Sequence, residues 1–143
     1  MSGDEDATVP AVCVFATADG TSRLADIRLP TLRVIPNDSG PSTFLGTYAA
    51  TLFGVVKGGA ATAKDWHISA TAGLSIVLNG AWEIEAGSGQ RRRLGPGSIL
   101  VMLDTHGQGH RAHYDPAGPC DVIGVGIGEA ARAEYEALVA GLV

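Results

Sequence analysis

The chain has 143 residues, of which 45% are hydrophobic and 17% charged, enough to bury the core of one domain. A formal net charge of −5 argues against a surface that binds nucleic acid. No apolar run approaches the length of a membrane span, and no basic, apolar leader opens the chain. These features predict a cytoplasmic protein that does not bind membranes. Residues 1–10 are mostly acidic or polar, and we expect them to form a flexible tail.

Short strands joined by glycine and proline turns account for most of the sequence. In chain order, the expected strands are Ala11–Thr17, Asp26–Leu29, Leu32–Ile35, one or two strands within Phe44–Val56, Leu74–Leu78, Ala81–Glu85, Gln90–Leu94, Ser98–Leu103 and Cys120–Ile127. Asn79-Gly80 is a pair favoured in type I′ turns, so it predicts a hairpin between the two strands that flank it. In that hairpin Trp82 and Ile84 share one face. Glu83 and Glu85 share the other, which we expect to face solvent.

The last segment has the composition of a helix. Glu129 to Val139 is rich in Ala, Glu and Leu. Four of the larger or apolar side chains recur at helical spacing: Ala131, Tyr135, Leu138 and Leu142. We therefore expect a single all-β domain over residues 11–128, followed by a C-terminal α-helix over residues 129–143.

Several segments together resemble the small single-domain members of the cupin superfamily. Leu94-Gly95-Pro96-Gly97-Ser98 looks like the PGD turn that opens the second cupin motif. Asp65-Trp66-His67 is similar to the DWH signature of one bacterial subgroup. Residues 104–110 (DTHGQGH) are similar to that subgroup's DTTGKGH segment, and residues 16–29 resemble its TGEDGxSxFEDVxL start. The resemblance covers roughly residues 12–127 and implies a jelly-roll barrel, also called a double-stranded β-helix.

The resemblance also implies a metal site, from which this chain departs. Metal-binding cupins supply two histidines as HxH, then a glutamate, then a later histidine. His67 and His110 fall on two of these positions, whereas Ser69 and Gly73 fall on the other two. Half of the usual ligands are kept, and the small residues 70–73 should widen the pocket at that wall.

The leading hypothesis is an enzyme that transfers protons without a metal or redox cofactor. A histidine in a partly apolar pocket can move a proton to or from carbon or oxygen. We expect His67 and His110 to do so, with Asp104 or Tyr48 as the orienting partner. The substrate would be a small carbonyl-bearing organic molecule, and the reaction that of an isomerase, cyclase or lyase. Six further residues are expected to contact it: Trp66, Phe53, Ser69, Gly73, Met102 and His106.

Two alternatives stay open. In the first, one divalent transition metal (Fe, Zn, Ni or Mn) serves a dioxygenase-like reaction. Its ligands would be His67, His106 and His110, with Asp104 as a fourth, in a loop that bends inward at its glycines. In the second alternative, the same pocket binds a metabolite without catalysis.

A homodimer is also expected, because an exposed sheet edge is a liability for a monomer. We expect the first strand or the final helix to contribute to its interface.

Overall fold

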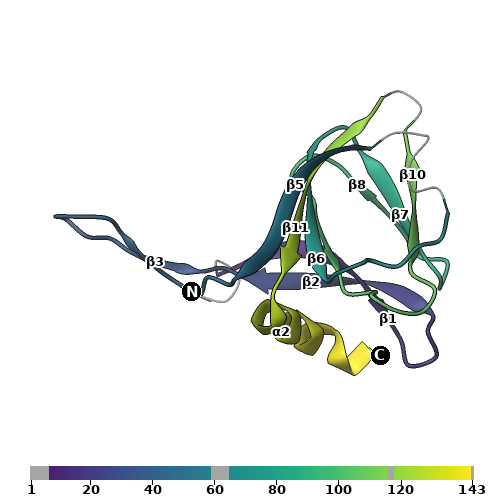
Figure 1. Ribbon diagram of the computed structural model, residues 1–143, viewed down its shortest axis with the longest axis horizontal. Helices are drawn as coiled ribbons and strands as arrows, with labels where there is room; N and C mark the ends of the chain where they lie inside the picture. The colour runs from purple at the N-terminus through teal and green to yellow at the C-terminus, as the bar shows by residue number, and fades with distance from the viewer. Residues whose placement is uncertain (1–6, 59–64, 116–117, 143) are drawn as a thin grey trace.

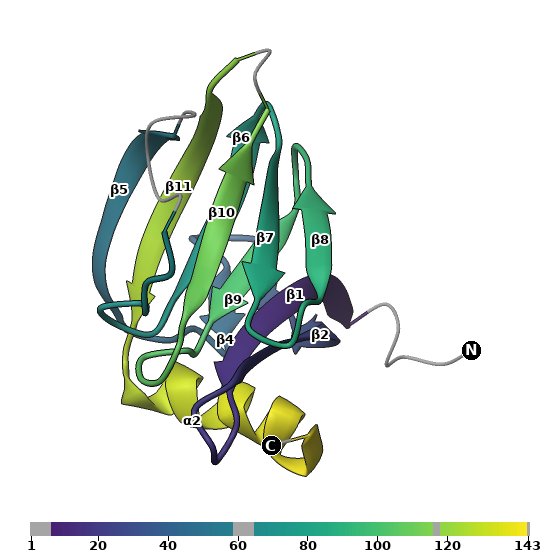
Figure 2. The same ribbon diagram turned by 90° about the vertical axis from the view of Figure 1, so that its right-hand side faces the viewer.

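The computed structural model describes residues 7–58, 65–115 and 118–142, and the described chain is mostly β-structure with one C-terminal helix (Figures 1 and 2). The strands are β1 (Thr8–Ala16), β2 (Ser22–Pro30), β3 (Arg33–Ile35), β4 (Thr43–Leu45), β5 (Ala50–Gly58), β6 (Gly73–Asn79), β7 (Trp82–Ala86), β8 (Arg91–Leu94), β9 (Ile99–Met102), β10 (His110–Tyr114) and β11 (Cys120–Ile127). Helix α2 (Glu129–Val139) follows, and a 3-10 turn, η1 (Ala140–Leu142), continues it. Among the described residues, no helix is both long and apolar enough to cross a membrane.

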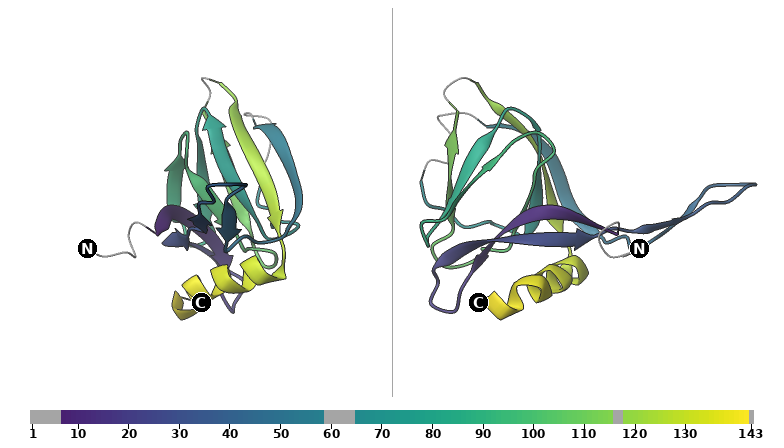
Figure 3. Two further views of the ribbon diagram at one scale, coloured as in Figure 1. Left: turned by 90° about the vertical axis from the view of Figure 1, so that its left-hand side faces the viewer. Right: turned by 180° about the vertical axis from the view of Figure 1, so that it is seen from behind.

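The described residues form three sheets. The large sheet has six strands in the order β2-β1-β9-β6-β11-β5, and the small sheet has three in the order β10-β7-β8. The small sheet lies across the inner face of the large sheet (Figure 2). Strands β3 and β4 pair only with each other, and this hairpin, residues 33–45, is called the arm. Figures 1 and 3 show the arm extending away from the two larger sheets.

The apolar residues form two packed layers, because alternate residues of the large sheet point to opposite faces. The layer between the two sheets joins Val14, Leu100, Ile84 and Ala112 with their neighbours. The layer between the large sheet and α2 includes Cys13, Val101 and Tyr135. The helix predicted at Glu129–Val139 is thus α2, and it covers the outer face of the large sheet (Figure 1).

The hairpin predicted across Asn79-Gly80 is wrong. The two strands that flank this turn belong to different sheets: β6 pairs with β9 and β11, whereas β7 pairs with β10 and β8. Both edges of β6 are occupied by other strands, so β7 cannot pair with it. Gly80 still has the positive φ, 72°, that the pair predicts. A Cβ there would lie 2.5 Å from the Pro119 carbonyl oxygen, so the turn carries the chain tightly from one sheet to the other.

The expected flexible tail over residues 1–10 is corrected in part. Residues 1–6 lie outside the described residues. Thr8, Val9 and Pro10 belong to β1 and pair with the end of β2. The turn between these strands, residues 17–21, approaches the segment that leads into β10, which matters for the site described next.

Candidate functional site

A buried carboxylate joins three segments where the chain crosses from the large sheet to the small sheet. Asp104 is 0% exposed and His110 is 4% exposed. Nδ1 of His110 lies 2.6 Å from Oδ2 of Asp104, and the Ser69 hydroxyl donates a 2.8 Å hydrogen bond to Oδ1. The Ser69 backbone N–H donates to the Asp104 carbonyl at 3.0 Å. A carboxylate removed from water is tolerated only when its oxygens are bonded, and here both are.

The bond to Asp104 sets which nitrogen of His110 carries the proton. A carboxylate accepts hydrogen bonds, so Nδ1 is the protonated nitrogen and Nε2 keeps its lone pair. The ring is also held in one orientation, because its carboxylate partner is itself held by Ser69. This arrangement suits a base that takes a proton at Nε2 while the carboxylate stabilises the resulting cation.

His67 lies directly beside His110. The two residues form an isolated antiparallel bridge, with N–H to carbonyl hydrogen bonds of 2.9 Å in both directions. Their ring centres are 4.6 Å apart at an interplanar angle of 61°. Nδ1 of His67 donates to the Asp65 carbonyl at 2.8 Å, so this ring also keeps its lone pair on Nε2. His67 is exposed, whereas His110 is buried, so the His67 ring lies between the His110 ring and solvent.

Glycine allows the close approach between these two histidine segments. Gly109 has φ of 75°, and a Cβ there would lie 2.0 Å from the His67 carbonyl oxygen. Any side chain at this position would force the two segments apart. Gly107 and Gly109, where the loop was expected to bend, both have positive φ, but the loop does not bring His106 to His110, because His106 lines a separate cavity.

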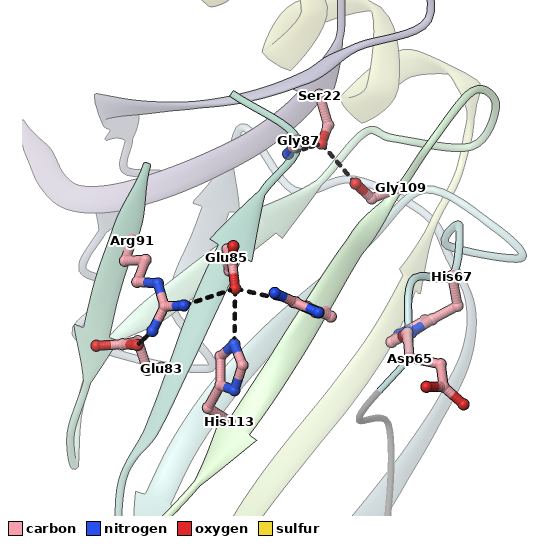
Figure 4. Close-up of polar contacts among 10 residues, drawn as sticks. Ser22, Asp65, His67, Glu83, Glu85, Gly87, Arg91, Gly109 and His113 are labelled. Carbon is pink, nitrogen blue, oxygen red and sulfur yellow. Dashed lines mark hydrogen bonds and ion pairs between the residues drawn. The ribbon is translucent and has the colours of Figure 1, made fainter. Parts of the chain in front are cut away.

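Ser22 holds the same loop from the other side, and sequence reasoning missed its role. Its hydroxyl donates to the Gly109 carbonyl and accepts from the Gly87 N–H, at 2.7 Å in the latter case (Figure 4). Ser22 is fully buried at the start of β2. A signal was present, because Ser22 aligns with the serine of the TGEDGxSxFEDVxL-like stretch.

A cavity of about 250 Å³ opens on the inner face of the large sheet. Four glycines line it, together with six other residues: Gly54, Gly73, Gly124 and Gly126, with Leu52, Phe53, Val56, Thr71, Met102 and Val125. Gly54 and Gly124 are direct partners across β5 and β11. A Cβ built on either one meets nothing within 4 Å, so missing side chains create the space.

The cavity and the buried Asp104 are neighbours along two segments of chain. Met102 lines the cavity and Asp104 follows two residues later; Thr71 lines it and Ser69 precedes it by two. Both connecting segments lie outside the strands, so the closeness is one along the chain. Of the predicted pocket residues, Gly73, Met102 and Phe53 line the cavity, whereas Ser69 is not among its lining residues. Phe53 is 79% exposed and contributes only at the rim.

Three predicted site residues make their contacts elsewhere. Tyr48 donates a hydrogen bond to Glu134 of α2, and this bond is the main cause that raises the pKa of Tyr48 to about 12. Trp66 stacks on Arg111, whose guanidinium carbon lies 4.8 Å from the ring centre. His106 lines a separate cavity beside α2. Tyr48 therefore contacts α2, Trp66 contacts a side chain of β10, and His106 lies beside α2, so none of the three joins His67 and His110.

The described residues do not fit the metal site that the resemblance implies. A transition-metal site needs about three protein ligands around one point. Within residues 7–58, 65–115 and 118–142, no group of three or more His, Cys, Asp or Glu side chains is placed to hold a metal ion. His106 lies in the other cavity, and the Asp104 carboxylate is bonded to Ser69 and His110.

The small sheet carries a cluster of charges on its outer face (Figure 4). One oxygen of Glu85 accepts hydrogen bonds from Arg111 at 2.9 Å, His113 at 2.8 Å and Arg91 at 3.0 Å. The bonds from Arg111 and His113 are the main causes that lower the pKa of Glu85 to about 2. Glu85 was expected to face solvent, but these side chains cover it and leave it 8% exposed. The cluster ties β10, which carries His110, to β7 and β8.

Neither cysteine is suited to act as a nucleophile. Cys13 and Cys120 are both free and fully buried. Burial, with the nearby Asp104 carboxylate as a second cause, raises the pKa of the Cys13 thiol to about 12. A thiol of this kind stays protonated and unreactive near neutral pH.

No protein family and no curated protein matches this chain.

Replacing Glu85 by Gln should destabilise the protein in a pH-dependent way. The folded-state pKa of Glu85, about 2, lies below its ordinary value of 4.5, so its stabilising contribution is complete above pH 4.5. That contribution is lost as the pH falls toward 2. Urea unfolding should therefore show a lower midpoint for Glu85→Gln at pH 7 and a smaller difference at pH 3. Glu83→Gln, on the same strand face but more exposed, should change the midpoint less at pH 7. Equal effects at both pH values would contradict the assigned cause.

Proposed function

We propose that the chain is a cupin-like jelly-roll protein that catalyses proton transfer on a small carbonyl-bearing organic molecule. The observation that carries the proposal is the hydrogen bond from Nδ1 of His110 to the fully buried carboxylate of Asp104. The two facing sheets and the DWH-like and DTTGKGH-like segments support the cupin assignment.

His110 is the proposed base. A proton taken from a carbon next to a carbonyl group would bond to Nε2, and Asp104 would stabilise the imidazolium through Nδ1–H. Ser69 acts as a positioning residue, because it donates a hydrogen bond to Asp104 and does not line the cavity. His67, exposed and 4.6 Å from the His110 ring, is placed to pass the proton to solvent or return it to another atom of the substrate.

The cavity suggests the size and character of the substrate. Its volume of about 250 Å³ and its lining of glycine, leucine, valine, phenylalanine and methionine suit a compact, largely apolar molecule. Isomerases, cyclases and lyases that act on carbonyl compounds include enzymes whose first step is loss of a proton next to the carbonyl group. The proposal concerns this step.

Exchange of protons for deuterium gives a test that does not require the natural substrate. Cyclohexanone and pyruvate serve as probe compounds in ²H₂O, and proton NMR follows loss of the signals next to the carbonyl group. We expect the wild type to accelerate exchange of at least one probe. His110→Gln should lower the rate at least 100-fold, the usual range for a lost general base. Gly124→Ala places a Cβ in the cavity that meets no atom within 4 Å, and it should lower the exchange rate by weakening binding of the probe. His106→Gln is the matched control and should leave it unchanged.

Two outcomes would contradict the proposal. Exchange that is as fast in His110→Gln as in the wild type would remove His110 from the reaction. A wild type that binds a probe in the cavity but exchanges none of its protons would favour the non-catalytic metabolite-binding alternative.

The metal content of the purified protein tests the metal-dependent alternative. Protein purified without added metal or chelator should contain no stoichiometric Fe, Zn, Ni or Mn by elemental analysis, because two imidazoles fall short of the usual three ligands. One metal per chain that is lost in both His67→Ala and His110→Ala would instead favour the metal-dependent alternative.

A further inference from the structure

The exposed apolar side chains are concentrated in one stretch of the chain. Among the described residues, fifteen large apolar side chains are exposed, and ten of them lie between Leu32 and Val56. This stretch covers the arm and most of β5. Its 25 residues include only two charged ones, Arg33 and Asp38. A large exposed apolar surface with few charges indicates an interaction site.

Strand β5 is uncovered on both faces and on one edge. Phe53 and Val55 point to one face and are 79% and 71% exposed; Leu52 and Val56 point to the other and are 57% and 54% exposed. Among the described strands β5 pairs only with β11, at the end of the large sheet. Natural proteins normally cover or charge such an edge, but residues 50–56 carry no charge and no proline.

The arm is also exposed and has little support from the rest of the chain. It consists of two three-residue strands that pair only with each other and point away from the rest of the molecule (Figures 1 and 3). Val34, Ile35, Phe44 and Leu45 are all exposed on it. An isolated two-stranded hairpin is at best marginally stable in water, so the arm needs a surface to lie on.

We propose that a second copy of this chain covers both elements, with the arm of each copy lying against β5 of the other. Each chain carries both an arm and an uncovered β5. In a dimer with two-fold symmetry, the arm of each chain can therefore cover β5 of the other. The stretch of 25 residues matches the roughly 20–30 residues per side of a stable interface. Its scarcity of charge matches the core of a homodimer interface.

The second copy would also complete the cavity. Leu52, Phe53 and Val56 line the cavity, and all three are more than half exposed in a single chain. The partner's arm, placed over β5, would shield this side from solvent. This part of the inference depends on the cavity alone, so it holds or fails independently of any acid–base reaction.

The mass in solution gives the first test. Light scattering should give twice the 14.6 kDa of one chain. Phe44→Glu in the arm and Phe53→Glu in β5 should each raise the dimer dissociation constant at least tenfold, as expected for a charge placed in an apolar interface. Leu138→Glu, at an exposed apolar position of α2, is the matched control and should leave the constant unchanged. Circular dichroism should show that all three variants are folded, since each replaced side chain is exposed.

Mixing the two interface variants tests the reciprocal arrangement. A mixed dimer of Phe44→Glu with Phe53→Glu keeps one unmodified arm against one unmodified β5, whereas each variant alone keeps none. The mixture should therefore dimerise at concentrations where each variant by itself is monomeric.

Three outcomes would overturn the proposal. A monomeric wild type at high micromolar concentration would mean that something other than a second copy covers this surface. A dimer weakened by Leu138→Glu but not by Phe44→Glu or Phe53→Glu would place the interface on α2. No recovery on mixing would exclude the exchange of arms. Hydrogen exchange of the wild type needs no variant, and amides of residues 33–45 and 50–58 should be slower at high than at low protein concentration.

Discussion

The buried carboxylate of Asp104 is the constraint on which the candidate site depends. Its two oxygens are bonded to Ser69 and His110, and its backbone carbonyl accepts the N–H of Ser69. Removing either side-chain partner would leave a buried charge incompletely bonded, which is strongly unfavourable. The carboxylate therefore fixes the segment that carries His67 and Ser69, the end of β9 and the start of β10 relative to one another. The orientation of the His110 ring is a consequence of this packing.

Further contacts restrict the movement of the segments that carry Asp104 and His110. Ser22 and Gly109 hold the loop before β10, and the charge cluster around Glu85 holds β10 to the rest of the small sheet. The cavity on the large sheet has a different origin, since Gly54 and Gly124 leave space there unfilled. In our proposal, the rigidly held His110 acts on a small molecule bound in this open, apolar space. The arm and β5, in contrast, lack internal support and depend on a second chain in our proposal.

Local sequence signals predicted most of the strands and the helix, because alternation and helical spacing reflect which face of each element is buried. Strand β10 (His110–Tyr114) was not among the expected strands. Cys120–Ile127 has the predicted bounds, and α2 begins at the predicted Glu129 but ends at Val139, before the 3-10 turn, instead of continuing to residue 143. The choice of strand partner was not predictable from the Asn79-Gly80 pair, since it depends on β9 and β11 occupying both edges of β6. The resemblance assigned His67 and His110 to positions of one site, and their ring centres lie 4.6 Å apart. The contacts of Tyr48, Trp66 and His106 depend on α2 and on the outer face of the small sheet, which the local pattern does not encode.

The most direct test of the central claim is the protonation state of the His110 ring in the folded protein. Nitrogen-15 NMR of histidine-labelled protein, at a pH where the ring is neutral, reports which nitrogen carries the proton. We expect the proton on Nδ1, with the lone pair on Nε2, and we expect Asp104→Asn to shift the ring toward the other form. A wild-type ring protonated on Nε2 would contradict the account, because His110 would then have no lone pair on that nitrogen to act as the proposed base.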